Sequence, residues 1–124
     1  MTDKTPEALT ATMLRKELYV ITTKPARSPE IKSQLPVHLE YQIKLEKEGT
    51  MFGAGPIYEE GDELPAGGMI IIRAANFEEA HQIADQDPLH QQGLRSYTVT
   101  KWLLNEGSMT FTVRYSDQTM IVEN

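Results

Sequence analysis

The spacing of apolar residues changes several times along this chain, and the order of those changes restricts the fold more than any other feature. Segments such as "ELYVITT" are rich in β-branched and aromatic residues, as buried strands are, whereas "FEEAHQIADQ" repeats its apolar residues at helical spacing. The predicted order is β-α-β-β-α-β, without an internal repeat. The strands are expected at 17–23, 50–57, 68–75 and 94–104, and the helices at 28–49 and 77–86.

The ends of the first helix carry residues that favour helix termini. Ser28 and Pro29 fit an N-cap and a first helical residue, and Gly49 fits a C-terminal stop. Pro36 lies between them and cannot donate a backbone hydrogen bond. We therefore expect a kink or a short turn, with the helix restarting near residue 36.

The element order suits a ferredoxin-like α+β fold, in which both helices cover one face of an antiparallel sheet. The other face would leave a large apolar patch in water, so we expect it to be covered in a symmetric homodimer that forms a dimeric α/β barrel. The last stretch, "MTFTVRYSDQTMIVEN", predicts a β-hairpin that pairs with a sheet edge, either in its own subunit or, as we favour, in a partner. The expected organisation is an N-terminal arm at 1–16, one domain at 17–105 and a hairpin extension at 106–124.

Composition argues against several classes of function. The chain has no cysteine, which excludes disulfides, a thiol nucleophile and a thiolate metal site. A formal charge of −6 with scattered Lys and Arg disfavours nucleic acid and anionic membranes, and the strand "GMIIIRAA" lacks the stacking aromatics of an RNA-binding sheet. The N-terminal stretch is polar and no apolar run reaches the roughly 20 residues of a membrane span. We expect a cytoplasmic protein with a small-molecule partner.

The stretch "PVHLEYQI" contains a histidine whose direction depends on helical phase. At about 100° per residue, with Leu35 at zero, His38 falls near 300° and Gln42 near 340°. Both positions lie within a broad apolar arc, with Glu40 on the opposite side. The apolar residues of that arc are Leu35, Val37, Leu39, Tyr41, Ile43 and Leu45. His38 and Gln42 are therefore predicted to point toward the sheet.

The second helix places a carboxylate on its own inner side. Asn76 fits its N-cap, and Asp87-Pro88 should end it because proline disfavours helical geometry in the preceding residue. In helical phase Asp87 falls with the apolar residues Ala80, Ile83 and Ala84. An Asp87 carboxylate that accepts from one nitrogen of His38 would fix the tautomer and prepare the other nitrogen as a general base. The alternative is a structural core histidine and an aspartate that caps a turn.

Two stretches, "HLEYQIKLEKEGTMFGAGP" and "GGMIIIRAANFEEAHQIADQDPLHQQGL", resemble the YCII-related proteins, small ferredoxin-like domains that pair into dimeric α/β barrels. The likeness covers roughly residues 17 to 105, and its most specific elements are His38-Leu39, Gly55-Pro56 and Asp87-Pro88. It implies a cleft with a His-Asp pair, which maps onto His38 and Asp87. Members with assigned chemistry include a dehydrochlorinase of chlorinated hydroxymuconate-type substrates, and related barrels include muconolactone isomerases. Members often carry Arg three residues before the histidine, where this chain has Leu35.

Four further residues are predicted to bind substrate. Gln42 shares the inward arc of the first helix, and Gly55 gives access to the backbone at a strand end. Tyr97 could form the wall of a cleft for an unsaturated ring, with core packing as the alternative. Arg73 and Arg95 are the cations that could replace the missing Arg, and we select Arg73, although strand alternation does not decide which face either residue takes.

Other polar residues carry weaker signals. His81 and Asp85 have the i, i+4 spacing of a metal-binding pair, but no third ligand is evident and a solvated pair is more common. His90 falls in an expected turn, where ordinary exposure is favoured over a role in a pocket. No G-x-x-x-x-G-K phosphate loop is present. We therefore expect neither a cofactor nor a metal.

The leading hypothesis is a cofactor-independent lyase or isomerase that acts on a small unsaturated or aromatic-derived acid. His38 would move a proton, and Asp87 would orient the imidazole and stabilise its charged form. One alternative is a cofactor-free monooxygenase of the same architecture. Another is a non-catalytic domain for small-molecule binding or oligomeric assembly.

Overall fold

The computed structural model describes residues 4–25 and 30–123, and within them residues Glu17–Leu103 form one compact unit. This unit contains a four-stranded sheet in the order β2-β3-β1-β4. Strand β3 is antiparallel to both of its neighbours, β1 and β2. The strands are β1 (Lys16–Pro25), β2 (Met51–Ile57), β3 (Gly67–Ile72) and β4 (Arg95–Leu104). The predicted ferredoxin-like α+β core is confirmed.

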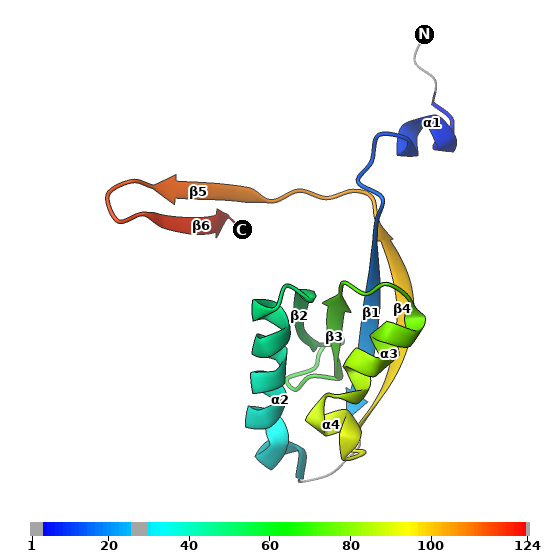
Figure 1. The fold of residues 1–124 in the computed structure, drawn as a ribbon. Helices are drawn as coiled ribbons and strands as arrows, with labels where there is room; N and C mark the ends of the chain where they lie inside the picture. The colour runs from blue at the N-terminus through cyan, green and yellow to red at the C-terminus, as the bar shows by residue number, and fades with distance from the viewer. Residues whose placement is uncertain (1–3, 26–29, 124) are drawn as a thin grey trace. The chain divides into compact units, whose positions relative to one another are not determined.

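Three helices, α2 (Glu30–Lys47), α3 (Phe77–Asp85) and α4 (Pro88–Gln91), lie over the same face of this sheet (Figure 1). Asn76 caps α3 as predicted, since its side chain accepts a hydrogen bond from the Glu79 backbone N–H. The predicted helix start at Ser28 and Pro29 lies outside the described residues. No helix of the described chain is long and apolar enough to span a membrane.

Strand alternation builds the core under α3. Tyr19 and Ile21 of β1 are buried beside their β3 partners Ile72 and Ile70. Thr23 continues the same phase and is also buried. Ala80 and Ala84 of α3 complete the cluster. Because these two side chains are small, α3 packs directly against the sheet.

Helix α2 differs from its prediction in two respects. It runs without a break from Glu30 to Lys47, so the predicted restart near Pro36 is wrong. Proline omits one hydrogen bond in a helix interior, and here packing beyond Pro36 outweighs that loss. The buried residues of α2 are His38, Gln42 and Leu45. The predicted apolar arc is too broad: Val37, Leu39 and Ile43 are 46%, 55% and 50% exposed.

Asp87 is buried for a different reason from the predicted one. Helix α3 ends at Asp85, and Asp87 is the N-cap of α4, with its Oδ1 accepting a hydrogen bond from the Leu89 backbone N–H at 2.9 Å. The helical phase of α3 therefore does not extend to Asp87. His90, expected in a turn, lies within α4 and is half-buried.

Two segments lie outside the compact unit. Helix α1 (Pro6–Thr10) is capped by Thr5, whose hydroxyl accepts from the Ala8 backbone N–H at 3.2 Å. Strands β5 (Thr110–Arg114) and β6 (Thr119–Glu123) pair in an antiparallel two-stranded sheet. One face of this hairpin carries four exposed apolar side chains, Phe111, Val113, Met120 and Val122. The predicted hairpin is present, and its pairing with a partner stays a prediction.

Candidate active site

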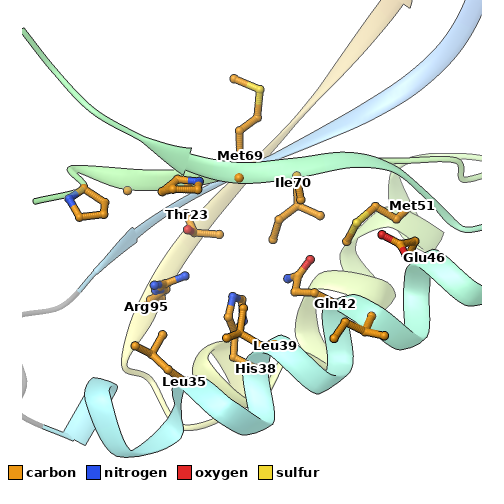
Figure 2. Close-up of a pocket in the computed structure, with 17 residues that line it drawn as sticks. Thr23, Leu35, His38, Leu39, Gln42, Glu46, Met51, Met69, Ile70 and Arg95 are labelled. Carbon is orange, nitrogen blue, oxygen red and sulfur yellow. The ribbon is translucent and has the colours of Figure 1, made fainter. Parts of the chain in front are cut away.

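A cavity of about 500 Å³ lies between α2 and the sheet (Figure 2). Leu35, Leu39 and Ile43 of α2 contribute apolar walls, and Met51 and Ile70 do so from the strands. This volume is in the range of small-molecule sites, about 300 to 1,000 Å³. The polar and charged side chains that line the cavity are Thr23, His38, Gln42, Glu46 and Arg95.

His38 and Asp87 are in direct contact. His38 Nδ1 lies 2.7 Å from Asp87 Oδ2, and the two residues are only 7% and 1% exposed. Gln42 Nε2 donates a second hydrogen bond to the same carboxylate oxygen, at 3.3 Å. The other oxygen caps α4 through the Leu89 N–H. One carboxylate therefore both caps a helix and binds the imidazole, so the two roles considered for Asp87 coexist.

The surroundings of Asp87 favour its ionised form. Burial acts to raise the pKa of Asp87, but the hydrogen bond and charge of His38, the Leu89 N–H and the charge of His90 together hold that pKa below its ordinary value. In the neutral form of an imidazole, an ionised carboxylate accepts from Nδ1–H and Nε2 is left unprotonated. An unprotonated imidazole nitrogen can accept a proton, and His38 lines the cavity.

Three polar atoms of cavity-lining residues are buried and have no hydrogen-bond partner in the described chain. They are Thr23 Oγ1, Gln42 Oε1 and Arg95 Nε. Burial lowers the pKa of Arg95, and the nearby negative charge of Asp87 opposes that shift. Buried polar groups normally have partners, so this set marks a place where a ligand can supply them.

Only two of the four predicted substrate-binding residues line the cavity. Gln42 and Gly55 line the cavity, whereas Arg73 and Tyr97 are not among its lining residues. Arg73 Nη1 donates to the backbone carbonyls of Gly49 and Met51, at 3.2 and 2.9 Å, just beyond the end of β3. These contacts direct Arg73 toward the start of β2 rather than into the cavity.

Tyr97 belongs to a polar group beside α3 and α4. Its hydroxyl donates to Asp85 Oδ1 and lies 3.1 Å from His81 Nδ1, and its ring centroid lies 4.7 Å from that of His90. His90 Nδ1 is 2.7 Å from the Ala84 carbonyl. The pair predicted as a weak metal candidate, His81 and Asp85, therefore shares a tyrosine hydroxyl. In the part of the chain that the structure describes, no three His, Asp or Glu side chains are grouped as metal ligands.

Three polar or charged residues of the cavity, Thr23, Glu46 and Arg95, were not selected from the sequence. Thr23 is the polar member of the inward phase that contains Tyr19 and Ile21, and that phase was the signal that could have identified it. Arg95 was considered and Arg73 preferred, but Arg95 lines the cavity. Leu35 also lines it, so the cation of this cavity comes from β4 while the position three residues before His38 is apolar.

Comparisons with known proteins agree with this architecture. Among solved structures, 5-chloro-2-hydroxyhydroquinone dehydrochlorinase from Burkholderia phenoliruptrix, in complex with 2,5-dihydroxybenzoquinone, is similar to this chain with a TM-score of 0.54 and 21% identity. The match covers 68% of this chain and 92% of that chain, and it supports the same fold. No curated protein matches the sequence. The family model of the YCII-related domain matches residues 17–103. The chain therefore belongs to the YCII-related family.

Proposed function

We propose that this protein is a lyase or isomerase that uses His38 as a general acid and base on a small unsaturated or aromatic-derived acid. The observation that carries the proposal is the 2.7 Å contact between His38 Nδ1 and a buried Asp87, on an imidazole that lines a cavity. A core histidine needs a partner but does not need an adjacent cavity of about 500 Å³.

In the proposed reaction, His38 Nε2 takes a proton from a carbon next to the unsaturated system. The electron pair of the broken C–H bond moves into that system, and Asp87 stabilises the imidazolium that forms. In an isomerisation, Nε2 returns the proton to another carbon. In an elimination, the electron pair instead expels a leaving group. The name of the similar structure, a dehydrochlorinase, favours the second course.

The proposal is tested by proton exchange in D₂O, which does not require the natural substrate. The protein is incubated with a panel of small unsaturated acids and with 5-chloro-2-hydroxyhydroquinone, the compound in the name of the similar enzyme. NMR then measures the loss of C–H signals and the release of chloride. We expect exchange or elimination with at least one compound, and a decrease of about 100-fold or more in His38→Gln.

His81→Gln is the matched control, since His81 is exposed and does not line the cavity. It should retain the wild-type rate. If no compound exchanges, or if His38→Gln and His81→Gln react equally fast, His38 is not a general base. The non-catalytic binding domain would then account for the cavity better.

We also propose that the sheet face opposite the helices is covered in a homodimer. The register that places Ile70 and Ile72 under the helices places Met69 and Ile71 on the other face, with Val20 beside Ile71. In Figure 2 the Met69 side chain lies on the other side of β3 from Ile70. Light scattering should give twice the 14.0 kDa mass of the chain. A monomer at dilute concentration would contradict this assembly.

The hairpin of β5 and β6 is proposed to pair with a sheet edge of a partner subunit. A two-stranded hairpin is only marginally stable alone, and this one exposes one apolar face. Deletion of residues 107–124 should therefore change the oligomeric state as well as the melting temperature. An unchanged assembly that melts earlier would contradict the pairing between subunits.

A further inference from the structure

The cavity has a positively charged side chain at one end and a negatively charged side chain at the other. Arg95 lines it from the start of β4, and Glu46 lines it from the last turns of α2 (Figure 2). His38, Gln42 and Glu46 are successive at four-residue spacing on α2, so Glu46 is about 12 Å along the helix from His38. In Figure 2, Arg95 lies at the Leu35 end of this row and Glu46 at the opposite end, with His38 and Gln42 between them.

The Arg95 side chain forms no hydrogen bond or ion pair with another residue that the structure describes, and its Nε is buried. The charge of Asp87 acts on Arg95, but the two side chains form no direct ion pair in the described chain, and the oxygens of that carboxylate accept hydrogen bonds from His38, Gln42 and Leu89. A partly buried cation without a partner is unfavourable, and an anionic ligand removes that penalty. The buried Thr23 hydroxyl in the same cavity also has no partner.

Gln42 restricts the kind of ligand group that can bind beside it. Its Nε2 donates one hydrogen bond to Asp87, and its Oε1 is buried without a partner in the described chain. Oε1 can only accept a hydrogen bond. Figure 2 shows His38 and Gln42 pointing from α2 toward the sheet between Arg95 and Glu46. A ligand group that pairs with Oε1 is therefore a donor, such as a hydroxyl, and a second negative charge farther along would be repelled by Glu46.

We propose that the substrate is a compact hydroxylated monoanion, whose anionic group is held by Arg95 and Thr23 and whose hydroxyl donates to Gln42 Oε1. This inference rests on the proposed function in one respect: it places the carbon that loses its proton to His38 between those two anchors. When that C–H bond breaks, the electron pair is delocalised toward the anionic group, where the guanidinium stabilises the added charge. Arg95 and Thr23 thus determine which end of the substrate reaches His38.

Binding of three simple probes tests the two anchors separately. The probes are meta-hydroxybenzoate, benzoate and meta-hydroxybenzyl alcohol. Their binding to the full chain is measured by NMR titration. Wild type should bind meta-hydroxybenzoate about tenfold or more tightly than the uncharged alcohol, and about three- to tenfold more tightly than benzoate. Arg95→Met should reduce the preference for the anion over the alcohol to less than twofold, with the affinity for the alcohol unchanged. Thr23→Val should weaken binding of both anions about threefold.

Lys44→Met is the control for charge, since Lys44 is exposed and paired with Glu48 on the outside of α2. It should leave all three affinities unchanged. Arg95→Lys keeps the positive charge but loses the planar guanidinium, so it should retain part of the preference for the anion over the alcohol. This variant replaces Arg95→Met in the test if Arg95→Met does not fold. A preference for the anion that survives in Arg95→Met, or that falls equally in Lys44→Met, overturns the proposal.

Failure of the anchor and failure of the catalytic proposal give different results. If His38→Gln exchanges protons as fast as wild type while Arg95→Met loses the anion preference, the anion site stands and the general base does not. If His38→Gln loses exchange while Arg95→Met binds as wild type does, the general base stands and the anchor is wrong.

Discussion

Helices α2 and α3 cover the same face of the sheet with different side chains. α3 contributes Ala80 and Ala84 to a cluster with Tyr19 and Ile72, in which apolar atoms are closely packed. α2 contributes His38 and Gln42, and between it and strands β2 and β3 there remains a cavity of about 500 Å³. Small apolar residues bring a helix close to a sheet, whereas larger polar residues that are held by other partners keep space open.

The polar groups on the two sides also differ in whether their unpaired buried atoms border the cavity. Near α3, the Tyr97 hydroxyl lies between the exposed His81 and Asp85, and His90 Nε2 is buried without a partner in the described chain but does not line the cavity. Near α2, Asp87 is fully engaged while Gln42 retains a buried atom without a partner. Unsatisfied buried atoms beside a cavity, rather than histidines as such, therefore distinguish the candidate site from a structural polar group.

The largest expected effect separates the two roles of Asp87. Asp87→Ala removes both the cap of α4 and the partner of His38, and should lower the free energy of unfolding by about 2 to 4 kcal/mol. Asp87→Asn keeps a capping side chain and should lose about 1 to 2 kcal/mol. Both variants should lose about 100-fold or more of the proton-exchange rate. Chemical denaturation and NMR exchange measure the two quantities, and equal stability of the variants would show that the cap contributes little.

A pair of leucine substitutions tests the difference in packing. Ala84→Leu inserts atoms into the core under α3 and should destabilise the protein by about 1 to 3 kcal/mol. Ala54→Leu adds the same atoms at an exposed residue that lines the cavity, and should change stability by less than about 0.5 kcal/mol. It should instead weaken binding of meta-hydroxybenzoate. Equal destabilisation by both substitutions would mean that the α2 side is as closely packed as the α3 side.

The pH dependence of stability tests the charge of Asp87. Its native pKa is held below the ordinary value of 3.8, so its ionisation stabilises the folded state fully above that pH. This contribution is lost as pH falls through the native pKa. The stability difference between wild type and Asp87→Asn should therefore shrink as the pH falls below about pH 4. Denaturation at several pH values measures it, and a difference that grows toward low pH would contradict the ionised pair.

The smallest effect is expected at Tyr97. Tyr97→Phe removes a hydroxyl whose partners, His81 and Asp85, are exposed, and should change stability by about 1 kcal/mol or less. It should leave the exchange rate unchanged, because Tyr97 does not line the cavity. A marked loss of rate in Tyr97→Phe would restore the role in substrate binding that the sequence had indicated.

Local sequence patterns predicted much of this molecule. Runs of apolar and β-branched residues predicted the four strands, and helical spacing predicted that His38 and Gln42 face the sheet. The same spacing overestimated the buried arc of α2, since Leu39 and Ile43 border a cavity instead of entering the core. A periodic pattern reports which side of an element is turned inward, but not whether the space there is filled.

By itself, the sequence determined the order of the main strands and helices, the cap at Asn76 and the inward phase of His38, because these depend on residues close together in the chain. Tertiary structure decided that Pro36 remains inside α2 and that Arg95 rather than Arg73 lines the cavity. Arg73 follows the last residue of β3 and binds carbonyls of another segment, while Arg95 begins β4 in the phase of the inner face. Both outcomes depend on where strands end and on which distant groups they meet, and neither is encoded by local periodicity.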